Sequence, residues 1–295
     1  MKKTLVVALT LTAMGVWSMQ GVALDIGTVT RAAKDIKDVA GAMDIDDKKE
    51  MEIGAAAHPG VVAQMGGEVR NPKLQQYINR VGQKLVSVSD RKSIPYHFTV
   101  LNTEEFNAFA LPGGYVYVTK GLLSAIRDES ELAAVLGHEI THVSHRHGIK
   151  QLQTALVTKK GLSYATNAVG GAVARETGSG AATWLAGEAM EKVMGVMMNF
   201  ALKGYGREQE LDADKTGIQF ANNAAYDPNG AVRMFEYLLK LEGGAKPKGM
   251  HALLSSHPDT ARRLEVAKAE VGQLPQPWGK MTNKPQFIGM VKGIK

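Results

Sequence analysis

Two histidines and a glutamate within residues 133–148, AAVLGHEITHVSHRHG, have the types and spacing of a catalytic metal site. His138 and His142 are four residues apart, so on a helix both imidazoles lie on one face and can bind the same ion. Glu139 follows the first histidine and can act on a water molecule at that ion. The spacing therefore predicts a zinc hydrolase site with Glu139 as the general base.

Two further histidines on the same predicted helix compete as ligands. His145 lies seven residues after His138 and can share its face, whereas His147 points elsewhere. A metzincin has glycine at the position of His145 and histidine at the position of Gly148, and this chain has the reverse. We therefore expect the third ligand to come from another segment, and His145 and His147 to be polar surface groups or groups behind the ligands.

The downstream stretch GYGREQELDADKTG supplies carboxylates at helical spacing. Glu210 and Asp214 are one turn apart. Glu210 can complete a site of two histidines and one glutamate, which leaves the fourth position open. Asp214 can accept the other ring N–H of one metal-binding histidine and fix its orientation. Taken alone, Glu210 and Asp214 also fit a solvated helix face. Because a catalytic zinc needs one more protein ligand besides His138 and His142, we expect Glu210 to be that ligand. His145 is the alternative third ligand.

A capped helix is predicted to carry the histidines. Asp128 and Glu131 form an Asp-x-x-Glu capping box just before the apolar run 132–136. A second amphipathic helix is predicted to begin at the pair Asn71 and Pro72, a cap followed by a first-turn proline. Its apolar residues recur at spacings of three and four, at Leu74, Tyr77, Ile78, Val81 and Leu85.

Two runs rich in β-forming residues, 95–102 and 113–121, predict a small sheet ahead of the histidine helix. The stretch between them, NAFALPGG, is interpreted as a strand beside that helix with an unpaired edge. Such an edge binds extended peptides by strand addition. The alternative is an ordinary hairpin turn. The predicted substrate-binding residues are Asn107, Ala108 and Phe109, of which Asn107 either fixes the loop or contacts the substrate backbone.

The first 23 residues have the pattern of a secretory signal peptide. Lys2 and Lys3 precede an apolar run over 5–17, and small residues at 21–23 offer a cleavage site. An uncleaved membrane anchor is the alternative, but the run is short for a spanning helix. The chain contains no cysteine, which excludes a lipoprotein anchor and a disulfide framework.

Length and composition predict one folded domain. The chain has 295 residues, of which 44% are hydrophobic and 22% charged. Its net charge is +6, but the sequence has no arginine-rich run interleaved with aromatic residues. Nucleic-acid binding is therefore not expected. Arg175 and Glu176 interrupt the middle apolar segment, so an integral membrane protein is not expected either. After the signal peptide at 1–23, we expect a single metallopeptidase domain over 24–295, made of an N-terminal helical part (24–92), a catalytic core (93–270) and a C-terminal tail (271–295).

Four stretches in order resemble the signatures of peptidase family M48: FNAFALPGGYVYVTKGLL, ELAAVLGHEITHVSHRH, REQELDADKTG and SSHPDTARRL. The family includes CAAX prenyl proteases, the membrane protease HtpX and secreted periplasmic members, and the chain is most similar to the last group. The resemblance runs from about Met51 to Val266. Asp212 departs from the aromatic-Glu-Ala pattern that is commoner in the family, which leaves the ligand roles intact.

The resemblance implies the roles of the site residues. His138, His142 and Glu210 would bind one Zn²⁺ per chain, and Glu139 would be catalytic. His257 and Arg263, in SSHPDTARR, would be further catalytic residues that stabilise the oxyanion. The alternative for His257 is a histidine that caps a loop before proline. A sharper hypothesis makes His257 a fourth zinc ligand in the resting enzyme, which keeps the site shut until substrate displaces it.

We expect an α+β fold of the zincin type, mostly helical, with a small sheet beside the histidine helix. The expected function is a periplasmic zinc metalloendopeptidase acting on unfolded or misassembled envelope proteins, with extended polypeptides as substrates and the outer-membrane assembly machinery as a candidate partner. One alternative is a chaperone or binding module with a self-inhibited zinc site, in which the Gly-, Ala- and Met-rich segment 159–206 grips clients. Another is a zinc hydrolase acting on a bond other than a peptide.

Overall fold

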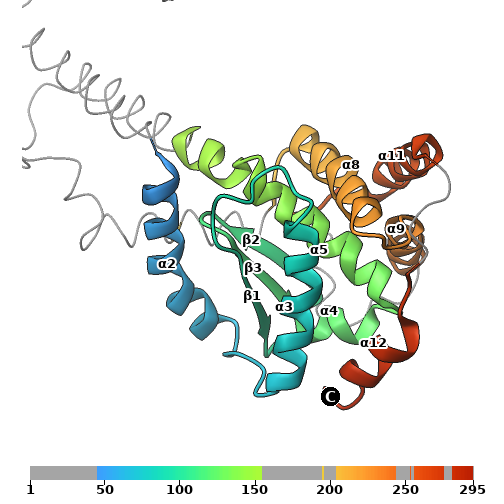
Figure 1. The fold of residues 1–295 in the computed structure, drawn as a ribbon, viewed down its shortest axis with the longest axis horizontal. Helices are drawn as coiled ribbons and strands as arrows, with labels where there is room; N and C mark the ends of the chain where they lie inside the picture. The colour runs from blue at the N-terminus through green and yellow to red at the C-terminus, as the bar shows by residue number, and fades with distance from the viewer. Residues whose placement is uncertain are drawn as a thin grey trace, which may run out of the picture. The chain divides into compact units, whose positions relative to one another are not determined.

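A computed structural model of the chain describes residues 45–154, 195, 204–243, 253, 256–275 and 281–294. The chain divides into two units, residues 1–41 and 42–295, and all described residues belong to the second. The predicted signal peptide and most of the segment 159–206 therefore lie outside the described residues. The described part is α+β, mostly helical with a small sheet (Figure 1).

The sheet has three strands: β1 (His97–Leu101), β2 (Ala108–Leu111) and β3 (Tyr115–Thr119). Its order is β1-β3-β2, with β1 parallel and β2 antiparallel to β3. The turn between β2 and β3 depends on Gly114, which has a φ of +93° and whose added Cβ would lie 2.0 Å from the Pro95 carbonyl oxygen. β2 is an edge strand of the described sheet, which confirms the strand predicted in NAFALPGG.

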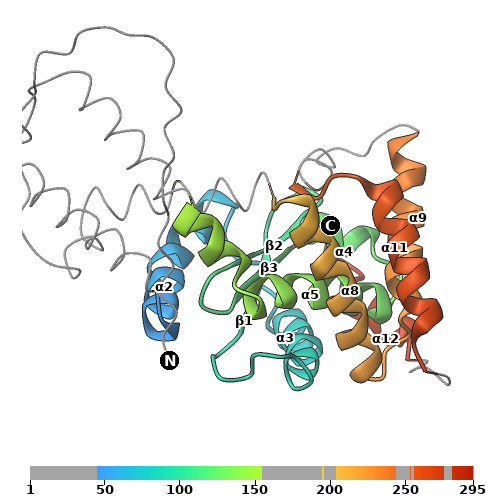
Figure 2. The ribbon, with the colours of Figure 1, turned by 90° about the horizontal axis from the view of Figure 1, so that it is seen from above.

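Helices cover both faces of the sheet. Figures 1 and 2 show α2 on one face and the pair α3 and α5 on the other. Because successive side chains of a strand point to opposite faces, Tyr117 packs toward α2, whereas Val116 and Val118 pack toward α3 and α5. The named helices among the described residues are α2 (Asp47–Gln64), α3 (Pro72–Val86), α4 (Lys120–Ala125), α5 (Glu129–Ser144), α8 (Arg207–Asn223), α9 (Asn229–Glu242), α11 (Thr260–Gln273) and α12 (Lys284–Val291).

The predicted helix starts agree with the structure. The Asn71 side chain accepts a hydrogen bond from the Leu74 N–H and Pro72 occupies the first turn of α3, whose five predicted apolar residues are buried. At α5, the Asp128 side chain accepts from the N–H groups of Ser130 and Glu131, each at 3.0 Å. In the predicted capping box, the Glu131 carboxylate would accept from the Asp128 N–H. It accepts instead from the N–H of the preceding residue, Arg127, at 2.8 Å.

The sequence predicted that the four histidines lie on one helix, and this prediction is wrong. α5 ends at Ser144, and Arg146 has a φ of +57°, a left-handed conformation that stops the helix. Residues 147–154 form a new helical segment after this turn. His147 therefore does not follow the periodicity of α5, and its position could not be obtained from helical spacing.

Two glycines allow α5 and α8 to approach closely, and the two helices lie side by side in both ribbon views. A Cβ on Gly217 of α8 would lie 2.6 Å from the backbone nitrogen of His138, and one on Gly137 of α5 would lie 2.7 Å from the Gly217 carbonyl oxygen. Gly137 and Gly217 meet beside His138. Because neither residue has a side chain, α5 and α8 come close enough for His138 and Glu210 to share one site.

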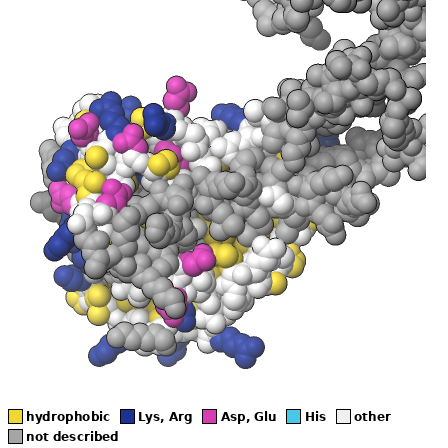
Figure 3. Space-filling view, turned by 180° about the vertical axis from the view of Figure 1, so that it is seen from behind, with side chains coloured by type: hydrophobic (Ala, Val, Ile, Leu, Met, Phe, Trp, Pro, Cys, Tyr) yellow, Lys and Arg dark blue, Asp and Glu magenta, His cyan; other side chains and the backbone are white. Residues whose placement is uncertain are grey.

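The residues predicted as a C-terminal tail include α12, which packs on the domain. Phe287 of α12 is fully buried, with its ring 6.4 Å from that of Tyr77 on α3. On the face drawn in Figure 3, basic, acidic and apolar side chains are interspersed over the described surface. No helix within the described ranges has both the length and the apolar character required to cross a membrane.

Candidate metal centre

Three predicted ligands from two helices converge on one point. His138 and His142 extend from α5, and their Nε2 atoms are 3.0 Å apart. Glu210 extends from α8, with Oε2 3.4 Å from His138 Nε2 and Oε1 3.6 Å from His142 Nε2. These separations are close to the distance of about 3.3 Å between two ligands that each lie about 2.0 Å from a tetrahedral zinc ion. The geometry therefore brings together the three ligands predicted from the sequence.

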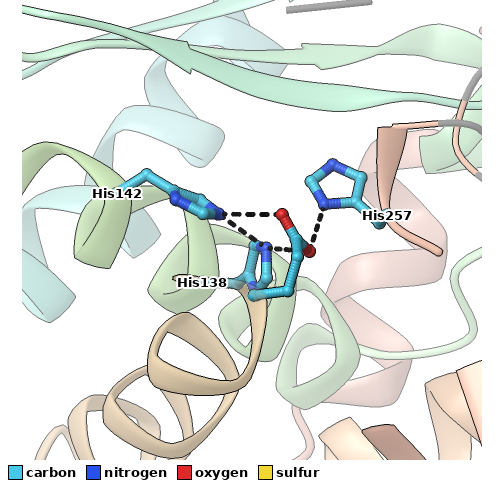
Figure 4. A group of neighbouring side chains, drawn as sticks. His138, His142 and His257 are labelled. Atoms are coloured by element: carbon cyan, nitrogen blue, oxygen red, sulfur yellow. Dashed lines mark hydrogen bonds and ion pairs between the residues drawn. The ribbon is translucent and has the colours of Figure 1, made fainter. Parts of the chain in front are cut away.

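His257, which lies just before α11, joins this group. Its Nδ1 donates a hydrogen bond to Glu210 Oε2 at 2.8 Å, and its Nε2 is 3.9 Å from Glu139 Oε1. Figure 4 shows the His257 ring pointing toward His138 and His142. The group of four, His138, His142, Glu210 and His257, offers ligand atoms that all lie within 4.8 Å of one another.

The residues present fit a cation. Glu210 Oε1 and Glu139 Oε2 are buried and have no hydrogen-bond partner among the described residues. A buried carboxylate oxygen without a donor is costly unless positive charge compensates it. Imidazole nitrogens with a carboxylate are the donor set typical of catalytic zinc. Burial also raises the pKa of Glu139, which suits a group that must take up a proton.

Asp214 and Arg263 support the ligands from behind. His138 Nδ1 donates to Asp214 Oδ1 at 2.8 Å, the contact predicted from the sequence, so His138 Nε2 is left free to bind metal. Arg263 donates to both oxygens of Asp214, at 2.6 and 2.7 Å. Burial opposes ionisation of Asp214, but the Arg263 guanidinium outweighs it and lowers the Asp214 pKa.

Arg263 faces the ligands. It is buried, its Nη1 lies 3.3 Å from Glu210 Oε2, and the same atom donates to the His257 carbonyl oxygen. With Nε and Nη2 engaged by Asp214, the guanidinium is tied to the carboxylates behind the metal centre. We therefore propose that Arg263 positions the ligands, in place of the oxyanion contact expected from the sequence.

Two groups contact His142: Tyr205, which was not identified from the sequence, and His147, which was expected on the surface or behind the ligands. The Tyr205 ring stacks on the His142 ring with centroids 3.8 Å apart and an interplanar angle of 13°. On the other side, His147 Nδ1 lies 2.9 Å from His142 Nδ1, and burial lowers the pKa of His147 to about 4, so this ring is neutral at pH 7. The only sequence signal for Tyr205 is its place five residues before Glu210.

An apolar pocket opens beside His138 and Glu139. Side chains of α5, α8 and α9 form most of its wall, and Leu253 and His257 border it. The apolar lining residues are Ala108, Leu122, Ala134, Val135, Ile218, Ala231, Met234, Phe235, Leu238 and Leu253. A pocket of this chemistry next to the metal centre accepts an apolar side chain.

The three residues predicted to bind substrate have different surroundings. Ala108 of β2 lines the apolar pocket, whereas Phe109 stacks on Tyr117 in the core on the α2 side of the sheet. Phe109 can therefore reach substrate through its backbone alone. Asn107 is fully buried, and its side-chain amide has no partner among the described residues.

A model of peptidase family M48 matches residues 72–271, which is more than half of the chain. The chain belongs to peptidase family M48. The resemblance carried by the four motifs is thereby confirmed. The described structure of this M48 chain, with its helices, small sheet and histidine cluster, is that of a zincin-type metalloprotease.

Named proteases are among the relatives of this M48 chain. The β-barrel assembly-enhancing protease of Escherichia coli (strain K12) is 30% identical over 268 residues, which are 85% of this chain and 51% of that protein. The mitochondrial metalloendopeptidase OMA1 of Schizosaccharomyces pombe is 30% identical over 192 residues, 64% of this chain and 50% of that protein. Metalloprotease YcaL of E. coli K12 is 25% identical over 218 residues, 73% of this chain and 78% of that protein. The chain spans about half the length of the E. coli assembly-enhancing protease.

Proposed function

We propose that this chain is a zinc-dependent metalloendopeptidase that hydrolyses peptide bonds of unfolded or misassembled envelope proteins. The observation that carries the proposal is the convergence of His138, His142 and Glu210 at the separations of zinc ligands, with Glu139 beside them. Membership of a metallopeptidase family supports the same reaction class.

The residues around the centre divide the chemistry between them. A zinc ion held by the three ligands would polarise the scissile carbonyl and lower the pKa of the attacking water. Glu139 takes the proton of that water and passes it to the leaving amine. Asp214 and Arg263 keep His138 and Glu210 in place throughout, because they are tied to these ligands by hydrogen bonds and ion pairs.

His257 has two proposed roles. Its ring is within reach of Glu210 and Glu139, so it can complete the ligand set in the resting protein and keep the site shut. When substrate displaces it, the same imidazole can donate to the developing oxyanion. The change from the first role to the second requires His257 to move, and Leu253 and His257 border the apolar pocket that substrate would enter.

The substrate is proposed to be an extended polypeptide. The outer edge of β2, which pairs with no strand among the described residues, offers backbone hydrogen bonds that do not depend on sequence. Ala108 of this strand lines the apolar pocket, so a peptide added to β2 can place an apolar side chain in it. This combination suits unfolded proteins, which expose both backbone and apolar side chains.

The envelope location is part of the proposal. The pattern of residues 1–23 is that of a cleavable signal peptide, and relatives bear the name β-barrel assembly-enhancing protease. We propose a periplasmic protein with the outer-membrane assembly machinery as a partner. Detection of the mature N-terminus near residue 24 in a periplasmic extract would test the location.

Cleavage of unfolded casein tests the reaction. The purified chain should cleave it, a chelator should abolish cleavage, and Glu139→Gln should lose activity while keeping its metal. The outcome against a peptidase is a wild type that cleaves nothing and yet suppresses aggregation of casein, which would favour the chaperone alternative.

Metal content tests the third ligand. Elemental analysis of the wild type, purified without added zinc, should give about one tightly bound zinc ion per chain, as a single catalytic site requires. Glu210→Ala should lose it. Full retention by this variant would return His145 to the position of third ligand.

A further inference from the structure

A second group of histidine and aspartate side chains lies outside the proposed catalytic centre. His145 follows the end of α5, His147 begins the next helical segment, and Asp212 belongs to α8. One ligand atom of each residue lies within 4.8 Å of the others. Asp212 Oδ2 is 2.5 Å from His145 Nδ1 and 3.3 Å from His147 Nε2.

Each imidazole of this group is held through its other nitrogen. His145 Nε2 is 3.2 Å from Asp90 Oδ2, and His147 Nδ1 is 2.9 Å from His142 Nδ1. Both rings therefore direct the remaining nitrogen at the same Asp212 oxygen. For His145, this is the arrangement typical of metal ligands, in which a carboxylate orients the ring through its far nitrogen.

Solvent has access to the group. The Asp212 and His145 side chains are 43% and 26% exposed, whereas His147 is 5% exposed. Asp90, which orients His145, is 63% exposed. An ion can therefore enter from the side of the two aspartates, with His147 as the buried ligand.

We propose that His145, His147 and Asp212 bind a second divalent cation, with zinc as the physiological ion and water completing its coordination. Two imidazoles and one carboxylate select ions of the zinc class over magnesium and calcium, which prefer oxygen ligands. The separation of 3.3 Å between His147 Nε2 and Asp212 Oδ2 already suits a tetrahedral ion. His145 Nδ1 is 2.5 Å from Asp212 Oδ2, so this partly exposed side chain has to move by less than about 1 Å to reach the same separation of 3.3 Å.

The second site is coupled to the catalytic centre through the contact between His142 and His147. An ion at His142 Nε2 leaves the proton of that ring on Nδ1, where it donates to His147 Nδ1. His147 then carries its own proton on Nε2, which faces Asp212. A second ion needs the lone pair of this nitrogen, so its binding shifts the His147 proton to Nδ1 and breaks the hydrogen bond from His142. Excess zinc should therefore inhibit the proposed peptidase; this consequence rests on the proposed function, whereas the site does not.

Equilibrium dialysis of the full chain against increasing free zinc, followed by elemental analysis, tests the site. The wild type should bind one ion tightly and a second ion more weakly. His145→Ala should weaken the second ion at least tenfold and leave the first unchanged, and Asp90→Asn should weaken it about tenfold. His97→Ala is the matched control, because His97 is exposed on β1 and belongs to neither histidine group; it should bind both ions as the wild type does.

A single zinc ion per chain at saturation, or a second ion that His145→Ala does not affect, would overturn the site. Glu210→Ala separates this test from that of the catalytic centre, because it should lose the tight ion and keep the weak one. In the casein assay, half-inhibition of His145→Ala should need about ten times more zinc than the wild type, in proportion to its weaker binding. Equal inhibition of the two proteins would overturn the coupling.

Discussion

At the level of single residues, each proposed ligand is oriented by a neighbour on another segment. Asp214 of α8 holds His138, His147 of the following helical segment holds His142, and His257 holds Glu210. Such supporting contacts commonly change metal affinity by about 10- to 100-fold when they are removed. The chemistry of the centre therefore depends on more residues than the HExxH motif contains.

Tyr205 provides a prediction at this level. Its ring covers the His142 ring with centroids 3.8 Å apart, so it restricts rotation of that ligand. Tyr205→Ala should reduce zinc affinity and casein cleavage about tenfold, within the range seen for groups that orient ligands. Zinc affinity is measured by competition with a chromophoric chelator.

The matched control is Tyr205→Phe, which keeps the ring and removes the hydroxyl. It should retain the zinc affinity of the wild type. An equal loss in both variants would show that the hydroxyl, and not the stacked ring, is the important group.

The sequence predicted the local relations of the site well. The spacing of His138 and His142 and the cap at Asp128 follow from residues a few positions apart, and the structure shows both. The contact of Asp214 with His138 joins residues 76 positions apart, and it was expected because Asp214 lies one turn after Glu210. The position of Tyr205 depends on how α8 packs against α5, for which the sequence contains no periodic signal.

At the level of elements, the distance between α5 and α8 determines whether Glu210 can reach the histidines. Gly217→Ala would place a Cβ 2.6 Å from the His138 nitrogen, which is backbone and cannot turn away. The helices must then separate, so the free energy of unfolding should fall by about 1–3 kcal/mol, as overpacking does, and zinc affinity should fall with it. Urea denaturation and zinc competition measure the two effects.

Gly272→Ala is the control for this substitution. Gly272 lies in α11, and no described atom lies within 4 Å of an added Cβ. Alanine should therefore stabilise this helix by about 0.5–1 kcal/mol through its higher helix propensity. A Gly217→Ala protein as stable as the wild type would show that the close approach is not required.

A buried ion cluster ties α2 to the end of α5. Glu50 is fully buried and lies 2.9 Å from Arg91 and 3.0 Å from Arg146, and it accepts from Gly113 N–H in the turn between β2 and β3. Arg91 also donates to the carbonyl oxygen of Val143 in α5. No sequence pattern indicated this cluster, because its members are far apart in the chain.

Glu50→Ala should therefore be strongly destabilising. It leaves two partly buried guanidinium groups without their carboxylate, a change that costs about 3–5 kcal/mol when the pair is buried. Glu52→Ala, at an exposed position of the same helix, should change stability by less than about 0.5 kcal/mol. A loss below about 1 kcal/mol for Glu50→Ala would show that solvent replaces the carboxylate, as it does for surface pairs.

At the level of the whole molecule, the proposed centre joins segments that are far apart in the sequence. His138 and His142 belong to α5, Glu210 to α8, and His257 precedes α11. The family resemblance predicted this convergence, whereas residue spacing alone left His145 as an alternative third ligand. The described structure favours Glu210, because His145 lies with Asp212 in the other group, whereas Glu210 lies with His138 and His142.

An ion bound by α5 and α8 stabilises the folded state by mass action, which leads to a prediction for metal removal. At free zinc about a thousandfold above the dissociation constant, the gain is about 4 kcal/mol. For a domain of this size, 1 kcal/mol changes Tm by about 2–4 °C, so a chelator should lower the Tm of the wild type by about 10 °C, and added zinc should restore it. Glu139→Gln should show the same shift, because Glu139 is not a ligand.

Glu210→Ala should start at the lower Tm and respond little to the chelator, since without the carboxylate of α8 the remaining histidines no longer connect the two helices. A full shift in Glu210→Ala would mean that the stabilising ion is bound elsewhere, and would contradict the proposed ligand set even if casein is cleaved.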